Sequence, residues 1–220
     1  MENNRIANII DHTLLKPEAT HGDLDILCQE SMKYGFASAC VNSSNVRYIN
    51  NLLKDSRVSV CSVVGFPFGA SRTEVKVYET GIAMEDGAEE IDMVINIGEF
   101  KNGNYDLVER DIREVKEAIG KDCILKVIIE APLLTEAEKI KATELVIVAG
   151  ADYVKTSTGI NAGGATLDDV ALLKNVAHGR IKVKAAGGIR DNATAIAMIE
   201  SGADRIGTSS GPKILGPEYS

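Results

Sequence analysis

One three-residue joint occurs three times along the chain, and it restricts the possible folds more than any other feature. A glycine, an alanine and an acid end a helical segment and open a β-branched run at Gly87-Ala88-Glu89, Gly150-Ala151-Asp152 and Gly202-Ala203-Asp204. Glycine supplies the left-handed conformation that ends a helix, alanine allows close packing, and the acid lies in the turn. A repeated helix-to-strand joint predicts repeated βα units and therefore a parallel sheet.

Short runs rich in Val and Ile alternate with amphipathic segments and predict eight strands. We expect the strands at residues 6–11, 36–41, 58–64, 91–95, 124–129, 153–155, 181–184 and 205–207. Helices are expected between them, at residues 20–34, 45–54, 74–86, 104–119, 136–149, 167–176 and 192–201. This α/β pattern in 220 residues favours a single-domain (β/α)8 TIM barrel over residues 1–220. An open doubly wound sheet is the alternative.

Composition narrows the class of partner. The chain is 45% hydrophobic and 25% charged, as in an ordinary globular protein. Its net charge of −8 argues against a nucleic acid or an anionic membrane as partner, but not against a small anionic substrate. The four cysteines include no Cys-x-x-Cys pair and suggest buried free thiols. With no signal-peptide core and no apolar stretch near 18 residues, we expect a cytoplasmic protein.

Lys155 is the most unusual charged residue in the sequence. It ends a short strand and runs into the hydroxyl-rich loop Thr156-Ser157-Thr158-Gly159. An apolar-flanked lysine at a strand end suits an amine that attacks a carbonyl. Lysine is nucleophilic only when neutral, so its reference pKa near 10.4 must fall by about 2–3 for work at neutral pH. Burial and a second nearby cation both act in that direction.

Lys184, near the end of the next strand, is the candidate for that second cation. The small residues that follow it, Ala185-Ala186-Gly187-Gly188, allow the backbone to approach a ligand closely. Its alternative is an exposed charge at a strand end. Lys182 lies toward the other end of the strand, and we expect it at the surface with its charged head in water.

Asp92 lies inside an apolar strand, where an unpaired carboxylate is costly. It is either a structural partner of Lys126 or of a backbone amide, or a proton-transfer group beside Lys155. Lys126 and Glu130 share one face of the following strand. They form either a structural ion pair, which we favour slightly, or a set of groups that orients the other lysines.

Glycine-rich loops follow the last two expected strands and predict a phosphate site. Glycine-rich loops at the end of the seventh and eighth strands are the recurring phosphate cradle of this barrel. The candidate phosphate ligands are the backbone and hydroxyl groups of Gly159, Gly187, Gly188, Gly207, Ser209 and Ser210. No His, Cys and Asp grouping has metal-ligand spacing, so we expect no metal site. His12 either touches the pocket or is a buried structural histidine.

The motifs taken together resemble the deoxyribose-phosphate aldolase family. The matching stretches run in order over about residues 9–211 and are Asp11-His12-Thr13-Leu14-Leu15, Val64-Gly65-Phe66-Pro67, Gly87-Ala88-Glu89-Glu90-Ile91-Asp92-Met93-Val94, Leu125-Lys126-Val127-Ile128-Ile129-Glu130, Val154-Lys155-Thr156-Ser157-Thr158-Gly159 and Val183-Lys184-Ala185-Ala186-Gly187-Gly188-Ile189-Arg190. The Lys-Thr-Ser-Thr-Gly run with the later Lys-x-Ala-Gly-Gly is the most specific part.

The resemblance implies a class I aldolase, a lyase of carbohydrate and nucleoside catabolism that needs no metal or cofactor. It implies Lys155 as the Schiff-base lysine, Lys184 as the second lysine that perturbs it, and Asp92 as the carboxylate of the proton relay. The implied reaction is reversible cleavage of 2-deoxy-D-ribose 5-phosphate to D-glyceraldehyde 3-phosphate and acetaldehyde. The implied partners are small phosphorylated sugars and aldehydes, with no nucleic acid and no membrane, and a possible homodimer.

Two departures and two alternatives accompany this resemblance. Some relatives carry a lysine after the Thr-Ser-Thr-Gly run, where this chain has Ile160, and only residues 212–220 remain for an eighth helix. Tyr219, in the short tail, either reaches the pocket or lies in a disordered end. The alternative functions are another Schiff-base barrel enzyme, such as a keto-acid phosphate aldolase or a thiazole synthase, and a non-catalytic phosphosugar-binding barrel.

Overall fold

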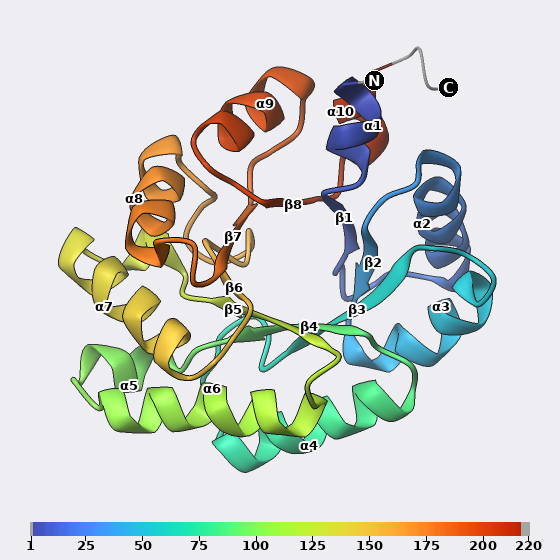
Figure 1. Ribbon diagram of the computed structural model, residues 1–220. Coiled ribbons are helices and arrows are strands. Elements are labelled where there is room, and N and C mark those ends of the chain that lie inside the picture. The colour runs from blue at the N-terminus through green and yellow to red at the C-terminus, as the bar shows by residue number, and fades with distance from the viewer. Residues whose placement is uncertain (1, 217–220) are drawn as a thin grey trace.

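Eight short strands close into one parallel barrel in the computed structural model, which describes residues 2–216 (Figure 1). Their order around the barrel follows the chain, and β1 pairs with β8 to close it. The strands are β1 Ile10–Leu14, β2 Ser38–Val41, β3 Ser59–Val64, β4 Glu90–Val94, β5 Ile124–Ile128, β6 Tyr153–Lys155, β7 Lys182–Ala186 and β8 Arg205–Thr208. The predicted (β/α)8 barrel is confirmed, and the open doubly wound sheet is wrong.

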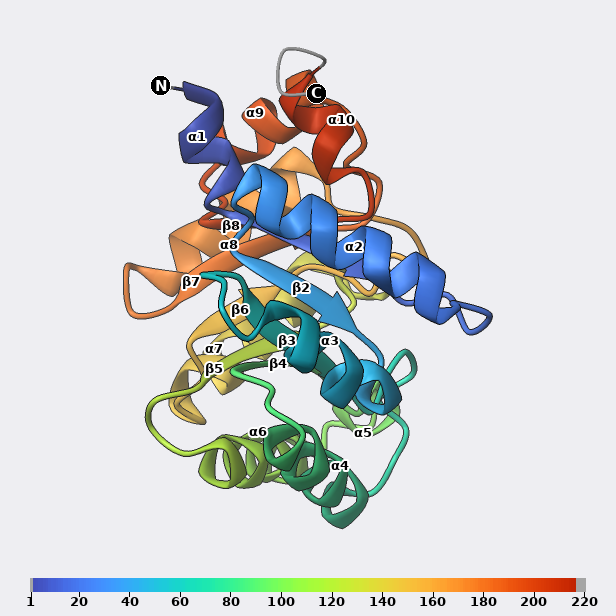
Figure 2. The ribbon, with the colours of Figure 1, turned by 90° about the vertical axis from the view of Figure 1, so that its right-hand side faces the viewer.

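Helices surround the barrel on its outside (Figures 1 and 2). They are α1 Glu2–Ala7, α2 His21–Tyr34, α3 Val46–Leu53, α4 Thr73–Glu85, α5 Ile97–Lys101, α6 Tyr105–Ile119, α7 Glu136–Val148, α8 Leu167–Ala177, α9 Asn192–Glu200 and α10 Gly211–Leu215, with short 3₁₀ turns at Ser43–Asn45 and Ala131–Leu133. Strand residues that face outward pack on the inner faces of the helices and form the apolar core. None of the helices in residues 2–216 is long and apolar enough to cross a membrane.

The repeated joint ends a helix and begins a strand at all three places. All three of its glycines have a positive φ, which only glycine adopts without strain, at Gly87, Gly150 and Gly202. The carboxylate of Asp152 accepts a hydrogen bond from the backbone N–H of Leu125 at 2.8 Å. Asp204 accepts one from the N–H of Val183, also at 2.8 Å. In these two joints the acid therefore binds the start of the preceding strand and fixes where the new strand pairs.

The beginning of the chain differs from the prediction. Residues 6–11 were predicted to form the first strand, but α1 extends to Ala7 and β1 begins at Ile10. Ile6 and Ala7 are buried in the core from a helix. Apolar residues over so short a run fit a helix as well as a strand, so the pattern alone could not decide between them. Helix α5, between β4 and α6, was also not predicted.

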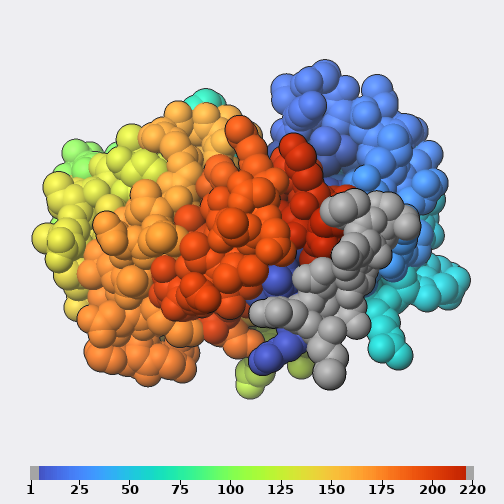
Figure 3. All heavy atoms as spheres, turned by 90° about the horizontal axis from the view of Figure 1, so that it is seen from above, coloured from blue at the N-terminus to red at the C-terminus, as the bar shows by residue number. Residues whose placement is uncertain are grey.

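The two ends of the described chain cover the last face of the barrel together. Helix α10 is short, but it packs against α1, α9 and β1. In Figure 3 the last described segments, in red, accordingly lie against the first ones, in blue. The N-terminal helix thus supplies cover that the short α10 lacks. The alternatives for Tyr219 concern a position outside the described residues.

Candidate active site

The interior of the barrel holds a layer of charged side chains instead of an apolar core. They come from six strands and are Asp11, Glu90, Asp92, Lys126, Lys155, Lys184 and Arg205, of which none is more than 9% exposed. Strand register brings them together, because Asp92 is paired with Lys126, and Lys184 with both Lys155 and Arg205. Buried charges are tolerated only where they are paired, and here every member has a partner of opposite charge.

Asp92 is the centre of this network. Its Oδ2 atom accepts hydrogen bonds from Lys155 Nζ at 2.6 Å and from Lys184 Nζ at 2.7 Å. Its Oδ1 atom accepts one from Lys126 Nζ at 2.9 Å. Burial alone would raise the pKa of Asp92, but the three ammonium groups more than offset burial and hold the pKa well below its usual range. Asp92 is therefore ionised. It is the structural partner of Lys126 that the sequence offered as one alternative, and its contact with Lys155 is the geometry that the other alternative, proton transfer, requires.

Lys184 is a fully buried, charged lysine. Besides Asp92 it contacts Asp11, whose Oδ2 atom lies 2.5 Å from Lys184 Nζ. Burial lowers the pKa of Lys184, but the carboxylates of Asp11 and Asp92 outweigh burial and raise it. The alternative of an exposed strand-end charge is therefore wrong. The amine keeps its proton, and Asp92 lies between it and Lys155.

Lys126 binds two carboxylates on the neighbouring strand β4, not Glu130, which follows its own strand. Its Nζ atom lies 2.5 Å from Glu90 Oε2 and 2.9 Å from Asp92 Oδ1. The predicted pair of Lys126 with Glu130 is wrong. The residue paired with Lys126 on β4 is about 4.8 Å away, whereas Glu130 is four residues, on the order of 13 Å, further along the chain.

Glu130 instead holds the loop that follows Lys155. It is fully buried, and its carboxylate accepts hydrogen bonds from the N–H of Thr158 at 3.1 Å and from the Thr158 hydroxyl at 2.6 Å. The side-chain amide of Asn161 donates a third bond at 3.1 Å. Glu130 also has a left-handed backbone with φ of 51°, which is unusual for a residue with a side chain. It positions the loop behind the lysine.

The ion pairs of Arg205 with Asp11 and Glu90 were not anticipated from the sequence. Arg205 Nη1 donates to Asp11 Oδ1 at 2.8 Å, and its Nη2 donates to Glu90 at 3.2 Å. Strand alternation was the available signal, since Glu90 has the parity of Asp92 and lies two residues before it. Lys182, in contrast, is at the surface as predicted, with its ammonium over the ring of Tyr153 at 5.5 Å.

A cavity of about 340 Å³ opens above the charged layer at the carboxyl ends of the strands. Lys155 is the only member of the layer among the described residues that line it. The predicted phosphate ligands Gly159, Gly187, Gly188, Gly207 and Ser209 also line this cavity. Ser210 is not among its lining residues, and its N–H donates to the Thr208 hydroxyl at 2.9 Å.

Two of the glycines on this wall are required by close packing. A Cβ on Gly187 would lie 2.8 Å from the Cα of Gly164 and 3.0 Å from that of Gly159. A Cβ on Gly207 would lie 3.0 Å from Lys184 Cε. A larger residue at position 207 would therefore displace the lysine that binds Asp92.

His12 and the cysteines lie beside the site. His12 is buried on the outer side of β1, bonded to Glu30 at 2.7 Å and packed on Phe36, so it is structural.

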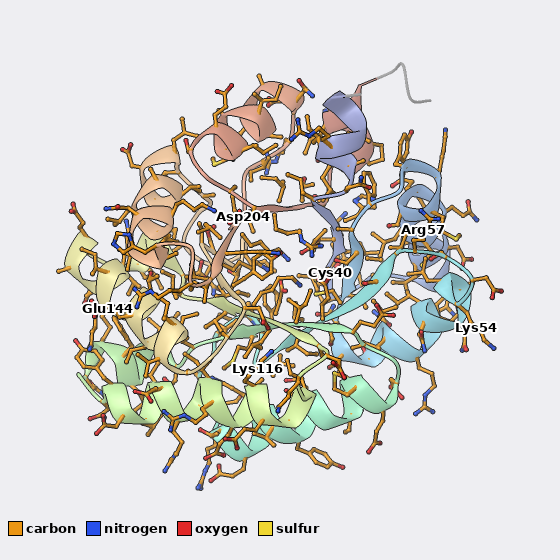
Figure 4. The ribbon with its side chains drawn as sticks, in the orientation of Figure 1. Cys40, Lys54, Arg57, Lys116, Glu144 and Asp204 are labelled. Atoms are coloured by element: carbon orange, nitrogen blue, oxygen red, sulfur yellow. The ribbon has the colours of Figure 1, made fainter. Side chains whose placement is uncertain are left out.

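Cys40, on the barrel wall in Figure 4, is paired in register with Cys61. The thiols and Asp92 offer three ligand atoms within 4.8 Å of one another. Lys126 Nζ lies only 3.4 Å from Cys61 Sγ, however, so this space already holds a cation.

Comparison with known proteins agrees with this geometry. The sequence model of the DeoC/LacD family aldolases matches residues 5–216. The chain is 56% identical to the deoxyribose-phosphate aldolase of Geobacillus sp. (strain WCH70) over 215 residues, which cover 98% of this chain and 96% of that one. It is also 56% identical to the enzyme of that name from Thermococcus gammatolerans over 213 residues, which cover 96% of this chain and 95% of the other.

A solved structure supports the same assignment. The deoxyribose phosphate aldolase from Aeropyrum pernix, described as a unique tetramer, superposes with a TM-score of 0.92. It is 36% identical in sequence, and the match covers all of this chain and 94% of that one. These similarities extend over the strands that carry Asp92, Lys155 and Lys184. The chain belongs to the DeoC/LacD family of aldolases.

Proposed function

We propose that this chain is a class I aldolase that reversibly cleaves 2-deoxy-D-ribose 5-phosphate to D-glyceraldehyde 3-phosphate and acetaldehyde. It is a lyase that works through a lysine Schiff base. One observation carries the choice of residue: within the described chain, Lys155 is the one amine that both lines the cavity and hydrogen-bonds to the buried carboxylate of Asp92. Lys126 and Lys184 are 0% exposed and lie beneath it.

The charged layer of the barrel holds more basic groups than carboxylates. The layer holds four basic groups, Lys126, Lys155, Lys184 and Arg205, and three carboxylates, Asp11, Glu90 and Asp92. Four positive charges against three negative ones leave one in excess. An uncompensated buried charge is costly, so the layer is balanced when one amine gives up its proton. Lys155 is the amine of this layer that faces the cavity.

The reaction follows from this arrangement. The neutral amine of Lys155 adds to C1 of the open-chain sugar, and loss of water gives an iminium ion. The 3-hydroxyl group then loses its proton, the C2–C3 bond breaks, and its electron pair moves to the iminium, which becomes an enamine. Glyceraldehyde 3-phosphate leaves. Protonation of the enamine at C2 and hydrolysis by water release acetaldehyde and restore Lys155.

Asp92 and Lys184 are proposed to move the protons. Asp92 contacts the reacting nitrogen, so its carboxylate can accept and return a proton as the carbinolamine forms and dehydrates. The charged Lys184, bonded to the same Asp92 oxygen, limits how long that proton stays on the carboxylate. Each step uses these side chains and water, so the proposal includes no metal and no cofactor.

The phosphate is proposed to lie in the glycine- and serine-lined part of the cavity. Backbone N–H groups of the loops after β6, β7 and β8, with the hydroxyl of Ser209, are suited to an anion. Ser210, which does not line the cavity, is left out of this proposal. This position orients the sugar with its C1 toward Lys155. We expect a keto-acid substrate to bind less well in this cavity, because its carboxylate needs a further cation close to Lys155. A cytoplasmic location and a homodimer also belong to this proposal.

Borohydride trapping tests the assignment directly. Acetaldehyde with borohydride should add one ethyl group to the protein, and peptide mapping should place it on Lys155. Lys155→Ala should abolish both the label and the cleavage of deoxyribose 5-phosphate, and a protein that still folds is recognised by its unchanged circular dichroism. A label on Lys184 or Lys126 would overturn the assignment of the nucleophile. A folded wild-type protein that takes up no label would favour the phosphosugar-binding alternative.

A further inference from the structure

Six of the seven charged side chains inside the barrel form a closed ring of ion pairs. Positive and negative groups alternate around this ring, and their order is Arg205, Asp11, Lys184, Asp92, Lys126 and Glu90, which returns to Arg205. Neighbouring atoms are 2.5 to 3.2 Å apart, and a longer contact of 3.7 Å from Lys126 to Asp11 crosses the ring. Each carboxylate uses one oxygen for each of its two neighbours in the ring. Cations and carboxylates are equal in number, so the ring is electrically balanced without Lys155.

Lys155 is outside the ring and meets it at one atom. Its Nζ atom donates to Asp92 Oδ2 at 2.6 Å, the same oxygen that Lys184 binds at 2.7 Å. Lys126 holds the other oxygen of Asp92 at 2.9 Å. Because two members of the ring hold Asp92, the ring determines where this carboxylate lies relative to the reacting amine.

Arg205, the first residue of β8, closes the ring. Its Nη1 atom donates to Asp11 at 2.8 Å, and its Nη2 atom donates to Glu90 at 3.2 Å. The guanidinium group is planar and permanently charged, so one side chain can bind two carboxylates at once. Its central carbon lies 5.8 Å from the centre of the Tyr153 ring. Arg205 is therefore the fixed cation of the ring, and it binds the two carboxylates other than Asp92.

Glu90 precedes Asp92 by two residues on β4, so both side chains point into the barrel. Glu90 therefore lies on the order of 7 Å further from the carboxyl end of the strand, where the cavity opens. Neither Glu90 nor Arg205 is among the described residues that line the cavity. Any effect of these two residues on a substrate in the cavity must therefore pass through the ring.

We propose that Arg205 and Glu90 are positioning residues for proton transfer at Lys155: they hold Asp92 in contact with the amine and keep the ring electrically balanced. This inference rests on the proposed function and deepens it, because it adds two residues that the substrate does not touch. A charge left unbalanced in the ring acts on Lys155, since charges inside a protein are screened less than charges in water. The ring thus adjusts how readily the amine holds its proton.

Every strand contributes a titratable or charged side chain to the inside of the barrel. In order from β1 to β8 these are Asp11, Cys40, Cys61, Glu90 and Asp92, Lys126, Tyr153 and Lys155, Lys184, and Arg205. The test changes residues 90 and 205 and leaves the others in place. Differences in pH dependence between the variants therefore report the charge at these two positions.

Opposite changes of charge provide the test. Glu90→Gln leaves the ring with an excess positive charge, which disfavours the ammonium form of Lys155, so the pH profile of the borohydride-trapped adduct rate should move to lower pH. Arg205→Gln leaves an excess negative charge and should move this profile to higher pH. Each shift should be about half a pH unit, smaller than the shift of about 1–3 units that a charge in direct contact causes.

Steady-state kinetics should show where the two residues act. In both variants kcat for deoxyribose 5-phosphate should fall about tenfold, since a displaced Asp92 loses part of the factor of about 100 or more that acid–base catalysis contributes. KM should change less than about twofold, because neither residue contacts the bound sugar. Arg205→Lys keeps the charge but lacks the planar fork that binds two carboxylates, so it should keep the wild-type pH profile at a reduced kcat.

Combining the two substitutions separates charge from packing. The double variant Glu90→Gln, Arg205→Gln has a balanced ring again, so its pH profile should return to the wild-type position. Glu109→Gln and Arg113→Gln are the matched controls, because they alter an Arg–Glu pair on α6, outside the barrel. They should change neither the pH profile nor kcat.

The inference is wrong if both single variants fold and keep the wild-type pH profile, or if their profiles move in the same direction. A double variant with a shifted profile would also overturn it. Circular dichroism identifies the variants that fold, and if Arg205→Gln does not fold, Glu90→Gln and the double variant still carry the test. Failure of the proposed function looks different, because then the wild-type protein itself would form no adduct with acetaldehyde.

Discussion

A hydrogen bond of 2.6 Å joins Lys155 Nζ to Asp92 Oδ2 across the inside of the barrel, between β4 and β6. The intervening strand β5 contributes Lys126 to the same carboxylate. One carboxylate therefore sets the position of the reacting amine and of two others. Asp92 is therefore the carboxylate through which the proposed mechanism moves protons at the nitrogen of Lys155.

Replacing Asp92 with Asn should lower kcat by at least about 100-fold, the range that general acid–base catalysis typically contributes. The amide retains the shape of the side chain but cannot accept the proton of Lys155. The rate of borohydride trapping by acetaldehyde should fall in parallel, because carbinolamine formation needs the same group. Asp55→Asn, at an exposed position, is the control and should keep wild-type rates. A loss of kcat smaller than tenfold in Asp92→Asn would remove Asp92 from the mechanism.

Lys184→Leu tests whether Lys184 acts by its charge. A charged neighbour disfavours protonation of Lys155, so the variant should form the adduct slowly at pH 7 and recover partly at higher pH, where an amine loses its proton unaided. Lys184→Arg keeps the charge and should preserve the pH profile at a reduced kcat. The measurement is the adduct rate as a function of pH. If the adduct rate of the Leu variant depends on pH as in the wild type, the charge of Lys184 is not what makes Lys155 reactive, and burial must be responsible.

Glu130→Gln should loosen the loop behind Lys155. Glu130 accepts three hydrogen bonds from Thr158 and Asn161, and a neutral amide with a single oxygen cannot replace them all. We expect a loss of about 1–3 kcal/mol in the free energy of unfolding together with a higher KM. Glu144→Gln, on the exposed face of α7, is the control (Figure 4). Denaturant titration and steady-state kinetics check both; unchanged stability in Glu130→Gln would show that the loop is held by its other contacts.

Asp11 makes the fold sensitive to acid. Burial alone would raise its pKa, but Lys184, Lys126 and Arg205 outweigh burial and lower it. The unfolded chain, with an aspartate pKa of about 3.9, thus binds more protons than the folded chain in acid. The stability that Asp11 contributes is therefore fully present above that pKa and is lost as pH falls below it. Urea titrations from pH 6 to pH 3 should show this fall.

The variant Asp11→Asn shows how much of the loss of folding stability in acid comes from Asp11. The variant should be less stable at pH 6, because Lys184 and Arg205 lose the charge that compensates them. Its stability should then depend less steeply on pH between 5 and 3, since one of the titrating carboxylates is gone. Asp55→Asn should retain the wild-type slope. If the free energy of unfolding of Asp11→Asn falls with pH as steeply as that of the wild type, other carboxylates cause the loss of stability in acid.

Sequence reasoning predicted the barrel, and it predicted that Asp92, Lys155 and Lys184 lie close together, for identifiable reasons. The glycine–alanine–acid joints repeat because each turns the chain from a helix into a strand at a glycine of positive φ, and alternation along β4 puts Asp92 on the inner face. Lys155 and Lys184 were singled out because the residues beside them, Val154 and Val183-x-Ala185, are unusual neighbours for a solvated charge. These are local properties, which a sequence displays directly.

The partners of these residues were not predictable in the same way. Which carboxylate meets Lys126 depends on the register between β4 and β5, and the sequence suggested Glu130 on the same strand instead. Arg205 and Asp11 meet only because β8 returns to β1. The first helix was missed because its few apolar residues suit two kinds of structure. Contacts between distant strands are properties of the closed barrel, not of any one segment.

The pairing of β1 with β8 has a consequence for the time at which the enzyme becomes active. Asp11 and Arg205 are 194 positions apart, and the network beneath Lys155 includes both. A nascent chain that still lacks β8 has neither this ion pair nor the Ser209 loop, although Lys155, Asp92 and Lys184 have already been synthesised. Contacts so distant in sequence form late and slowly. Catalytic competence should therefore appear only when the last strand is in place, so a partly made or truncated barrel would carry the reactive lysine without the pocket that directs it.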